Sequence, residues 1–242
     1  MRILIISDIH ANLTALDTVL NDAGQVDAVW CLGDLVGYGP DPNECVERVQ
    51  QLPNLVCLIG NHDAAVSGDI GITTFNNEAR LAVIWTQRVI EPANLEFLRA
   101  LSPQTVIDSV SLAHGSPRQP IWEYLLDTHT AFQNFDHFDT PFCFVGHSHL
   151  PVVFQMQAEK RTADLSIPQI NSSLNMIPRA IYNPGSVGQP RDRDPRAAYA
   201  IFDSVGQTWD YRRVSYDIQS VQDRMQSANL PQRHIQRLFA GW

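Results

Sequence analysis

Short apolar runs recur along the chain, and each ends at a glycine or a polar residue. They are RILIIS before Asp8, VWCL before Gly33, LVCLI before Gly60 and FCFV before Gly146. Runs of this length that stop at such residues are typical of buried strands rather than helices. The pattern therefore predicts four buried strands, three of them within the first 60 residues.

Helical patterns separate the first three predicted strands. Residues 12–23 have apolar side chains at helical spacing, and Gly24 follows as a stop signal. Residues 42–52 form a second predicted helix, in which Pro42 suits the first turn and Asp41 can serve as a cap. Alternation of strand and helix predicts a parallel βαβ core with right-handed crossovers.

Shorter strands dominate the second half of the predicted structure. After helices at 74–90 and 92–100, the pattern predicts a second, more antiparallel sheet and two C-terminal helices at 216–227 and 231–240. Residues 159–176 are polar and are predicted to be irregular surface structure. The strands of the second sheet are expected at 104–108, 110–114, 141–145, 152–157, 180–183, 197–203 and 207–214.

Composition favours one α/β domain that spans residues 1–242. A chain of 27.1 kDa with 44% hydrophobic residues can bury a full core. No apolar run is long enough for a signal-peptide core or a membrane span, so we expect a cytoplasmic protein with no membrane partner. The formal net charge of −9 argues against a nonspecific nucleic-acid surface.

The four cysteines are expected to be buried, reduced thiols that pack as small apolar residues. They have no C-x-x-C spacing, and all but Cys45 lie in predicted strands.

Five of the eight histidines lie in short polar clusters that follow the predicted strands. Strands of one sheet would bring these clusters to the carboxyl edge, where open α/β sheets bind their ligands. The clusters hold seven candidate metal ligands without a thiolate, which is too many for one tetrahedral ion and suits two ions of Mn, Fe, Zn, Ni or Co. The seven are Asp8, His10, Asp34, Asn61, His114, His147 and His149.

In order along the chain, these clusters are D-x-H, GD, GNHD, HG and GHSH. This order resembles the calcineurin-like metallophosphoesterase superfamily, and in particular its small single-domain bacterial and archaeal phosphodiesterases. The later NPGSVG segment, residues 183–188, extends the resemblance. The resemblance implies a four-layer α/β/β/α sandwich of two mixed sheets flanked by helices.

The resemblance also implies how the ligands divide between two divalent ions. Asp8, His10 and His149 would bind one ion, and Asn61, His114 and His147 would bind the other. Asp34 would bridge the two ions.

The same resemblance implies the reaction. A small-molecule or nucleotide phosphodiester would be hydrolysed by a hydroxide that bridges the ions, with His62 as general acid. Asp63 would hold the imidazole of His62 in orientation. The alternative for His62 is a further metal ligand or a structural hydrogen-bonding residue.

Local geometry adds an expectation about the ligand loops. If residues 147–149 are extended, His147 and His149 point the same way, and Asp8 and His10 have the same spacing. Glycines 33, 60 and 146 precede ligands and are expected to let the chain turn there.

Three arginines, Arg118, Arg191 and Arg193, are the candidates for binding a phosphate or another part of the substrate. Trp122 and Tyr124 could line the substrate pocket or could be ordinary packed aromatic residues. The loop 37–40 could line its rim. His129, His137 and His234 lie outside the motifs and are expected to be surface or core histidines.

Three classes of function remain open at this stage. The first is a phosphodiesterase for a small phosphate ester, and the second is a phosphomonoesterase or protein phosphatase of the same superfamily. The third is a scaffold subunit that has kept the fold and lost the chemistry. A full set of ligands favours an enzyme, a metal-dependent phosphoric ester hydrolase. The native metal and the oligomeric state stay open.

Overall fold

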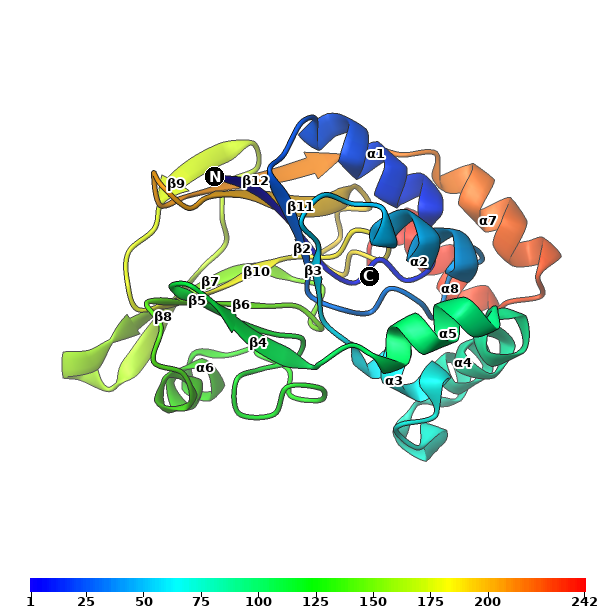
Figure 1. The fold of residues 1–242 in the computed structure, drawn as a ribbon, viewed down its shortest axis with the longest axis horizontal. Coiled ribbons are helices and arrows are strands. Elements are labelled where there is room, and N and C mark those ends of the chain that lie inside the picture. Colours follow the sequence, from blue (N-terminus) through cyan, green and yellow to red (C-terminus); the bar gives the residue numbers. More distant parts are fainter.

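Two six-stranded sheets form the centre of the computed structural model, which describes residues 1–242 (Figure 1). The order of the first sheet is β3 (Val56–Cys57), β2 (Ala28–Cys31), β1 (Arg2–Ile6), β11 (Ala197–Asp203), β12 (Thr208–Val214) and β9 (Ser172–Asn175). The order of the second is β4 (Gln104–Ile107), β5 (Val110–Ala113), β6 (Phe142–Val145), β10 (Ala180–Pro184), β7 (Pro151–Gln157) and β8 (Thr162–Ser166).

Both sheets are mixed. In the first sheet β1, β2 and β3 are parallel, and the remaining pairs are antiparallel. In the second sheet β6 is parallel to both β5 and β10, and the outer pairs are antiparallel. The predicted parallel βαβ core is therefore confirmed, and β11 and β12 extend it instead of joining the second sheet.

Helices cover the outer faces of the two sheets (Figure 1). On the outer face of the first sheet, α1 packs on β11 and β12, and on the outer face of the second sheet α6 packs on β7 and β8. No helix has both the length and the apolar character that crossing a membrane requires. The helices are α1 (Leu13–Ala23), α2 (Pro42–Gln50), α3 (Asn61–Ser67), α4 (Asn77–Val89), α5 (Pro92–Arg99), α6 (Thr128–Asn134), α7 (Ile218–Ser227) and α8 (Gln232–Ala240).

Strand β1 shows why the apolar runs are continuous. Ile3 and Ile5 pack between the sheets with Trp30, while Leu4 and Ile6 pack toward the helices. Successive side chains of a strand point to opposite faces, so a strand that is buried on both faces needs apolar residues at every position.

The prediction of irregular structure for residues 159–176 is wrong, because this segment contains β8 and β9. Each strand lies at an edge of its sheet, and in β8 only Ala163 is buried. Edge strands with exposed polar side chains lack the apolar pattern by which a buried strand is recognised. The short helices α3 and α6 were also absent from the predicted elements.

Candidate metal centre

Loops from both sheets meet at one place and bring the seven predicted ligands together. Four of these residues follow β1, β2 and β3 of the first sheet, and three follow β5 and β6 of the second. All seven side chains are buried, with at most 4% of any residue exposed. In order they are Asp8, His10, Asp34, Asn61, His114, His147 and His149.

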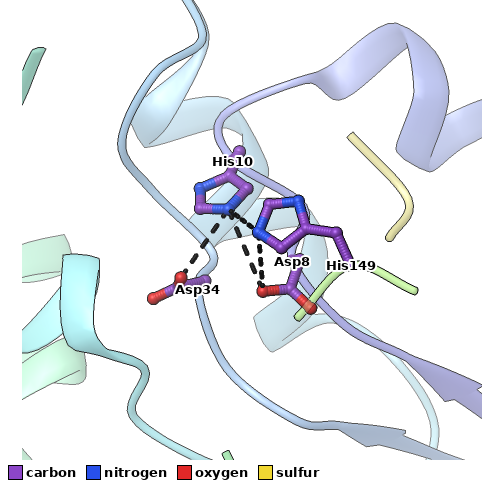
Figure 2. A group of neighbouring side chains, drawn as sticks. All are labelled: Asp8, His10, Asp34 and His149. Carbon is purple, nitrogen blue, oxygen red and sulfur yellow. Dashed lines mark hydrogen bonds and ion pairs between the residues drawn. The ribbon is translucent and has the colours of Figure 1, made fainter. Parts of the chain in front are cut away.

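The side chains form two groups that share Asp34. Asp8, His10, Asp34 and His149 each offer a ligand atom within 4.8 Å of the others, as do Asp34, His114 and His147 (Figure 2 shows the first group). Oδ2 of Asp34 lies 3.6 Å from Nε2 of His10 and 3.6 Å from Nε2 of His114. One carboxylate oxygen therefore lies between the two groups.

The fourth polar side chain of the second group is an amide. Oδ1 of Asn61 lies 3.3 Å from Nε2 of His114. Asn61 is the first residue of α3, so the start of this helix places the amide beside the imidazole.

Backbone carbonyls orient the imidazole rings of three of the candidate ligand histidines. Nδ1 of His10 donates to the carbonyl of Val36 at 3.1 Å, and Nδ1 of His149 donates to the carbonyl of Gln189 at 2.6 Å. Nδ1 of His114 donates in the same way to Leu32 at 2.8 Å. A carbonyl only accepts, so Nδ1 carries the proton and each Nε2 presents a lone pair to the centre.

His147 is oriented in the opposite sense. Its Nε2 lies 3.3 Å from the carbonyl of Trp122, so Nδ1 is the nitrogen left for the centre.

The contacts within the first group fit a bound cation. Nε2 of His10 and Nε2 of His149 lie 3.1 Å apart, so two lone pairs face each other. Oδ1 of Asp8 lies 3.3 Å from the same nitrogen of His149, is buried and has no hydrogen-bond partner. Electron pairs at these distances repel unless a positive charge lies among them. The mixed nitrogen and oxygen donors suit a divalent transition metal.

Burial also shifts the pKa values of these groups. It raises the pKa of Asp8 to about 7 and that of Asp34 well above its usual value. It lowers the pKa of His10 well below its usual value, and the nearby His62 lowers it further. Burial likewise lowers the pKa of His147 and of His149 well below the usual value, so these imidazoles are held neutral, the form in which imidazole binds a metal.

The backbone at five of the seven candidate ligands is left-handed rather than extended. The φ angles of Asp8, His10 and Asp34 are 54°, 49° and 54°, and those of His147 and His149 are 63° and 59°. The expectation of an extended segment at 147–149 is therefore wrong. Asp, Asn and His occupy this region more readily than other residues that have a Cβ atom, and a metal site needs Asp and His for its chemistry as well.

Of the three glycines that precede ligands, only Gly33 has a positive φ, of 99°. Gly60 serves another purpose, because a Cβ atom there would collide with the carboxylate of Asp34. The expectation that all three turn the chain is wrong for Gly60 and Gly146.

The NPGSVG segment braces the ligand loops of both sheets. The amide of Asn183 donates to the carbonyl of Gly146 at 2.7 Å, and the hydroxyl of Ser186 donates to the carbonyl of Asp8 at 2.8 Å. Its position beside the site agrees with the sequence analysis.

His62 lies next to the shared carboxylate. Its backbone amide donates to Oδ1 of Asp34 at 2.8 Å, and its side chain lines the cavity above the centre. Burial lowers the pKa of His62 well below its usual value, and the positive charge of Arg191 lowers it further.

Asp63 does not hold the imidazole of His62, contrary to the expectation. Its carboxylate accepts from the backbone amides of Gly60, at 2.9 Å, and Val36, at 3.0 Å. Nδ1 of His62 is buried without a hydrogen-bond partner. Asp63 therefore caps α3 and ties it to the loop after β2, because an acidic side chain at a helix start satisfies free amides.

A cavity of about 450 Å³ opens above the centre. Its floor is formed by ligands and His62, and its walls are aromatic. The ring of Tyr124 stacks on His147, with centroids 3.8 Å apart, and Phe75 meets His62 edge-on at 5.0 Å. Trp122 and Tyr124 both line the cavity, which is the first of the two alternatives considered for them. Tyr38, from the loop 37–40, also lines it.

The three candidate arginines lie in different surroundings. Arg191 lines the cavity. Arg118 pairs with Glu123 and donates to Gln133, and it is not among the cavity residues. Arg193 is exposed and lies outside the cavity as well. Of the three, the structure brings only Arg191 to the centre.

Three residues near the centre were missed or undervalued in the sequence. Gln189 accepts from the ligand His149, and its place directly after NPGSVG was the available signal. Arg237 and His234 come from α8, and His234 is buried with its ring centroid 4.4 Å from that of Tyr38. The sequence carried no signal for Arg237, because charged residues on a terminal helix are usually solvated.

Comparison with known proteins gives a consistent result. The sequence profile of the calcineurin-like phosphoesterase superfamily domain matches residues 1–206. An uncharacterized protein of Methanocaldococcus jannaschii is 38% identical over 247 residues, covering 99% of this chain and 98% of that protein.

Solved structures agree with the sequence matches. A metallophosphoesterase from Sphaerobacter thermophilus is 46% identical, with a TM-score of 0.91, covering 100% of this chain and 99% of that chain. A hypothetical protein from Pyrococcus horikoshii OT3 is 19% identical and has the same fold, with a TM-score of 0.80, covering 100% and 98% of the two chains. The predicted sandwich of two mixed sheets is confirmed.

Proposed function

The chain belongs to the calcineurin-like phosphoesterase superfamily and is a phosphoric ester hydrolase, and from this premise we propose that it is a dinuclear phosphodiesterase for small nucleotide-type esters. The observation that carries the proposal is the position of Asp34. Its Oδ2 is equally far, 3.6 Å, from a histidine of each ligand group.

The proposed ligand sets follow the two groups. Asp8, His10 and His149 would hold one divalent ion, Asn61, His114 and His147 would hold the second, and Asp34 would contribute to both sites. Two ions in such a site supply positive charge to the phosphate and make a water molecule nucleophilic at neutral pH. The protein's own part is to orient the histidine rings through backbone carbonyls, so that an unprotonated nitrogen of each ring faces the centre.

His62 is the proposed general acid for the leaving oxygen. It lines the cavity beside Asp34, within reach of an ester bound at the centre. Its low pKa means that the free protein carries a neutral imidazole at neutral pH. A phosphate anion bound against the ring would raise the pKa, because an opposite charge favours the protonated form. Substrate binding and protonation of His62 are therefore coupled in this mechanism.

The cavity supports a diester with an aromatic substituent. Its walls include Tyr38, Phe75, Trp122 and Tyr124, and of these Trp122 and Tyr124 are exposed enough for a nucleobase to stack on them.

Residues 1–242 are proposed to act as one catalytic domain in the cytoplasm. Helix α8, near the end of the chain, packs His234 against Tyr38 in the cavity wall, so the C-terminal part of the chain supports the site formed by the earlier segments. All four cysteines are free thiols, which a reducing compartment maintains.

Metal removal and reconstitution test the proposal. Purified protein is stripped with a chelator and reloaded separately with Mn, Fe, Zn, Co or Ni. Hydrolysis of bis(p-nitrophenyl) phosphate and metal content by elemental analysis are then measured. We expect the stripped protein to be inactive and the active protein to hold two ions per chain. Full activity at one ion per chain would overturn the dinuclear assignment, and no hydrolysis with any metal would overturn the phosphodiesterase.

A further inference from the structure

Two arginines beside the centre meet at one amide oxygen. Oε1 of Gln189 accepts from Nη2 of Arg191 at 3.0 Å and from Nη1 of Arg237 at 3.3 Å. Arg191 lies in the loop between β10 and β11, and Arg237 lies on α8. Segments far apart in the sequence thus place two positive charges side by side.

Neither guanidinium group forms an ion pair with a carboxylate. This distinguishes them from Arg213 and Arg224, which pair with Asp192 and Asp41. The Nε atoms of Arg191 and Arg237 are also buried without a hydrogen-bond partner. Donors of two like charges are therefore left unsatisfied at the same place.

This arrangement costs free energy in the absence of an anion. Burial lowers the pKa of Arg237, and the positive charge of Arg191 lowers it further. Guanidinium groups bind phosphate with strong charge-assisted hydrogen bonds, and their planar donor geometry matches its oxygens. An anion at this position would offset both the desolvation of the guanidinium groups and their mutual repulsion.

The arginine pair is connected to the cavity and to the metal centre. Arg191 lines the cavity together with His62, and its guanidinium carbon lies 5.8 Å from the centroid of the Tyr38 ring. Gln189, which holds the two guanidinium groups through its side chain, accepts from the ligand His149 through its backbone carbonyl. A group bound to Arg191 would therefore lie in the same cavity as the ester at the centre.

We propose that Arg191, positioned and reinforced by Arg237, forms an anion subsite that binds a second phosphate group of the substrate. The inference rests on the proposed function and narrows its substrate class to phosphodiesters that carry a further phosphate. Arg191 contacts the second phosphate in this proposal, and Arg237 acts through Gln189 and through its charge.

A matched pair of esters tests the subsite. Thymidine 5′-(p-nitrophenyl phosphate) and its 3′-phosphorylated derivative have the same leaving group and nucleoside, and differ by one phosphate. The metal-loaded protein is assayed on both, and the ratio of the two kcat/KM values is the readout. We expect the wild type to prefer the derivative with the second phosphate.

Variants assign this preference to the arginines. Arg191→Gln should lower the ratio about 10- to 100-fold, the range for losing a charged hydrogen bond. Arg237→Gln should lower it about 3- to 10-fold through loss of positive charge nearby, and Arg237→Lys should restore most of the preference. Arg233→Gln is the control, because Arg233 lies on the same helix, is exposed and bonds to Glu78 at 3.4 Å. It should leave the ratio unchanged.

Phosphate binding by chelator-treated protein gives a second readout that does not depend on turnover. Calorimetric titration with inorganic phosphate should show binding to the wild type and to Arg233→Gln, and much weaker binding to Arg191→Gln. The subsite would be overturned if the wild type and all variants had the same ratio of kcat/KM values and none of them bound phosphate. The proposed phosphodiesterase would then still stand. Absence of turnover on both esters, with phosphate binding that depends on Arg191, would overturn the phosphodiesterase and leave the anion subsite.

Discussion

Oδ1 of Asp34 accepts a hydrogen bond from the backbone amide of His62 at 2.8 Å, while Oδ2 lies between the two groups of candidate ligands. The carboxylate that is proposed to join two metal ions therefore also positions the residue that is proposed to protonate the leaving group. A substitution of Asp34 should therefore affect both metal binding and the position of His62.

Asp34→Asn tests the shared carboxylate. The amide oxygen can still accept from the backbone of His62, but the negative charge between the two groups is lost. We expect metal content to fall well below two ions per chain. Activity should fall by more than the roughly 10- to 100-fold that changes around metal ligands cost. Elemental analysis and hydrolysis of bis(p-nitrophenyl) phosphate check this, with Asp136→Asn as an exposed control. Two tightly bound ions in Asp34→Asn would contradict the shared role.

His62→Ala separates proton donation from metal binding. Both ions should remain, and the loss of kcat/KM should depend on the leaving group. An alkoxide needs the proton, so the deficit on an alkyl ester should reach about 10²–10⁴-fold, whereas p-nitrophenolate leaves with little help. His10→Ala should instead lose metal and fail on both esters. An equal loss for His62→Ala on both esters, with metal retained, would mean that the imidazole binds phosphate instead.

Diesters should be hydrolysed faster than monoesters that have the same leaving group. The cavity of about 450 Å³ leaves space beside the centre for a second substituent on the phosphorus, which a monoester lacks. Comparison of bis(p-nitrophenyl) phosphate with p-nitrophenyl phosphate measures this preference. A large preference for the monoester would indicate a phosphomonoesterase of the same superfamily.

Trp122→Ala should weaken the use of nucleotide esters. Trp122 is 38% exposed at the cavity wall and packs edge-on against Phe75, so its removal should leave the centre intact. Stacking of a base on an aromatic ring contributes about 1–3 kcal/mol. We expect kcat/KM to fall accordingly on thymidine 5′-(p-nitrophenyl phosphate), and little change on methyl p-nitrophenyl phosphate. Equal losses on both would show that Trp122 supports the wall and does not contact the base.

His234 should make the folded protein sensitive to acid. The pKa of His234 is lowered to about 4, mainly by burial and next by the positive charge of Arg237; Arg191 and Arg233 act in the same direction, and the backbone carbonyl of Glu78 opposes them. The unfolded chain takes up this proton near pH 6.5 and the folded protein only near pH 4, so the free energy of unfolding falls as the pH drops through this window. The loss from this one group is about 3 kcal/mol.

Urea unfolding of chelated protein at pH 7 and pH 4.5 measures this effect. His234→Leu removes the group, so the variant should lose less stability between the two pH values than the wild type does. The same pH dependence in both proteins would assign the acid sensitivity to the buried carboxylates and the other histidines.

The seven candidate ligands could be selected from the sequence because each one follows an apolar run that predicts a strand. Adjacent parallel strands end at a common edge, which explains proximity within each sheet. The expectation that the strands of one sheet gather all the clusters is wrong, because the centre lies where the loops of both sheets meet. The left-handed backbone at Asp8 and His149 could not be predicted, because it depends on carbonyls and amides supplied by distant segments such as residues 183–189.

The roles of Asp63 and Arg237 could not be predicted from the sequence either, because they depend on tertiary contacts. An acidic residue after a histidine suggests a catalytic partner, and only the position of the amides of Gly60 and Val36 shows that it caps a helix. Arg233 and Arg237 are one helical turn apart, and only the packing of α8 makes one exposed and turns the other toward Gln189. The edge strands β8 and β9 were not predicted because few of their side chains are buried, so they lack the apolar pattern of a buried strand.

The ligands come from two different sheets, and this division has a consequence for the lifetime of the protein. Ions held between the loops of both sheets would act as a brace across the sandwich, and a ligand at one hundred times its dissociation constant stabilises a fold by about 2.7 kcal/mol. The metal-free chain would open more often at this edge and be degraded faster by proteases. We therefore expect metal supply in the cell to set the abundance of this protein as well as its activity.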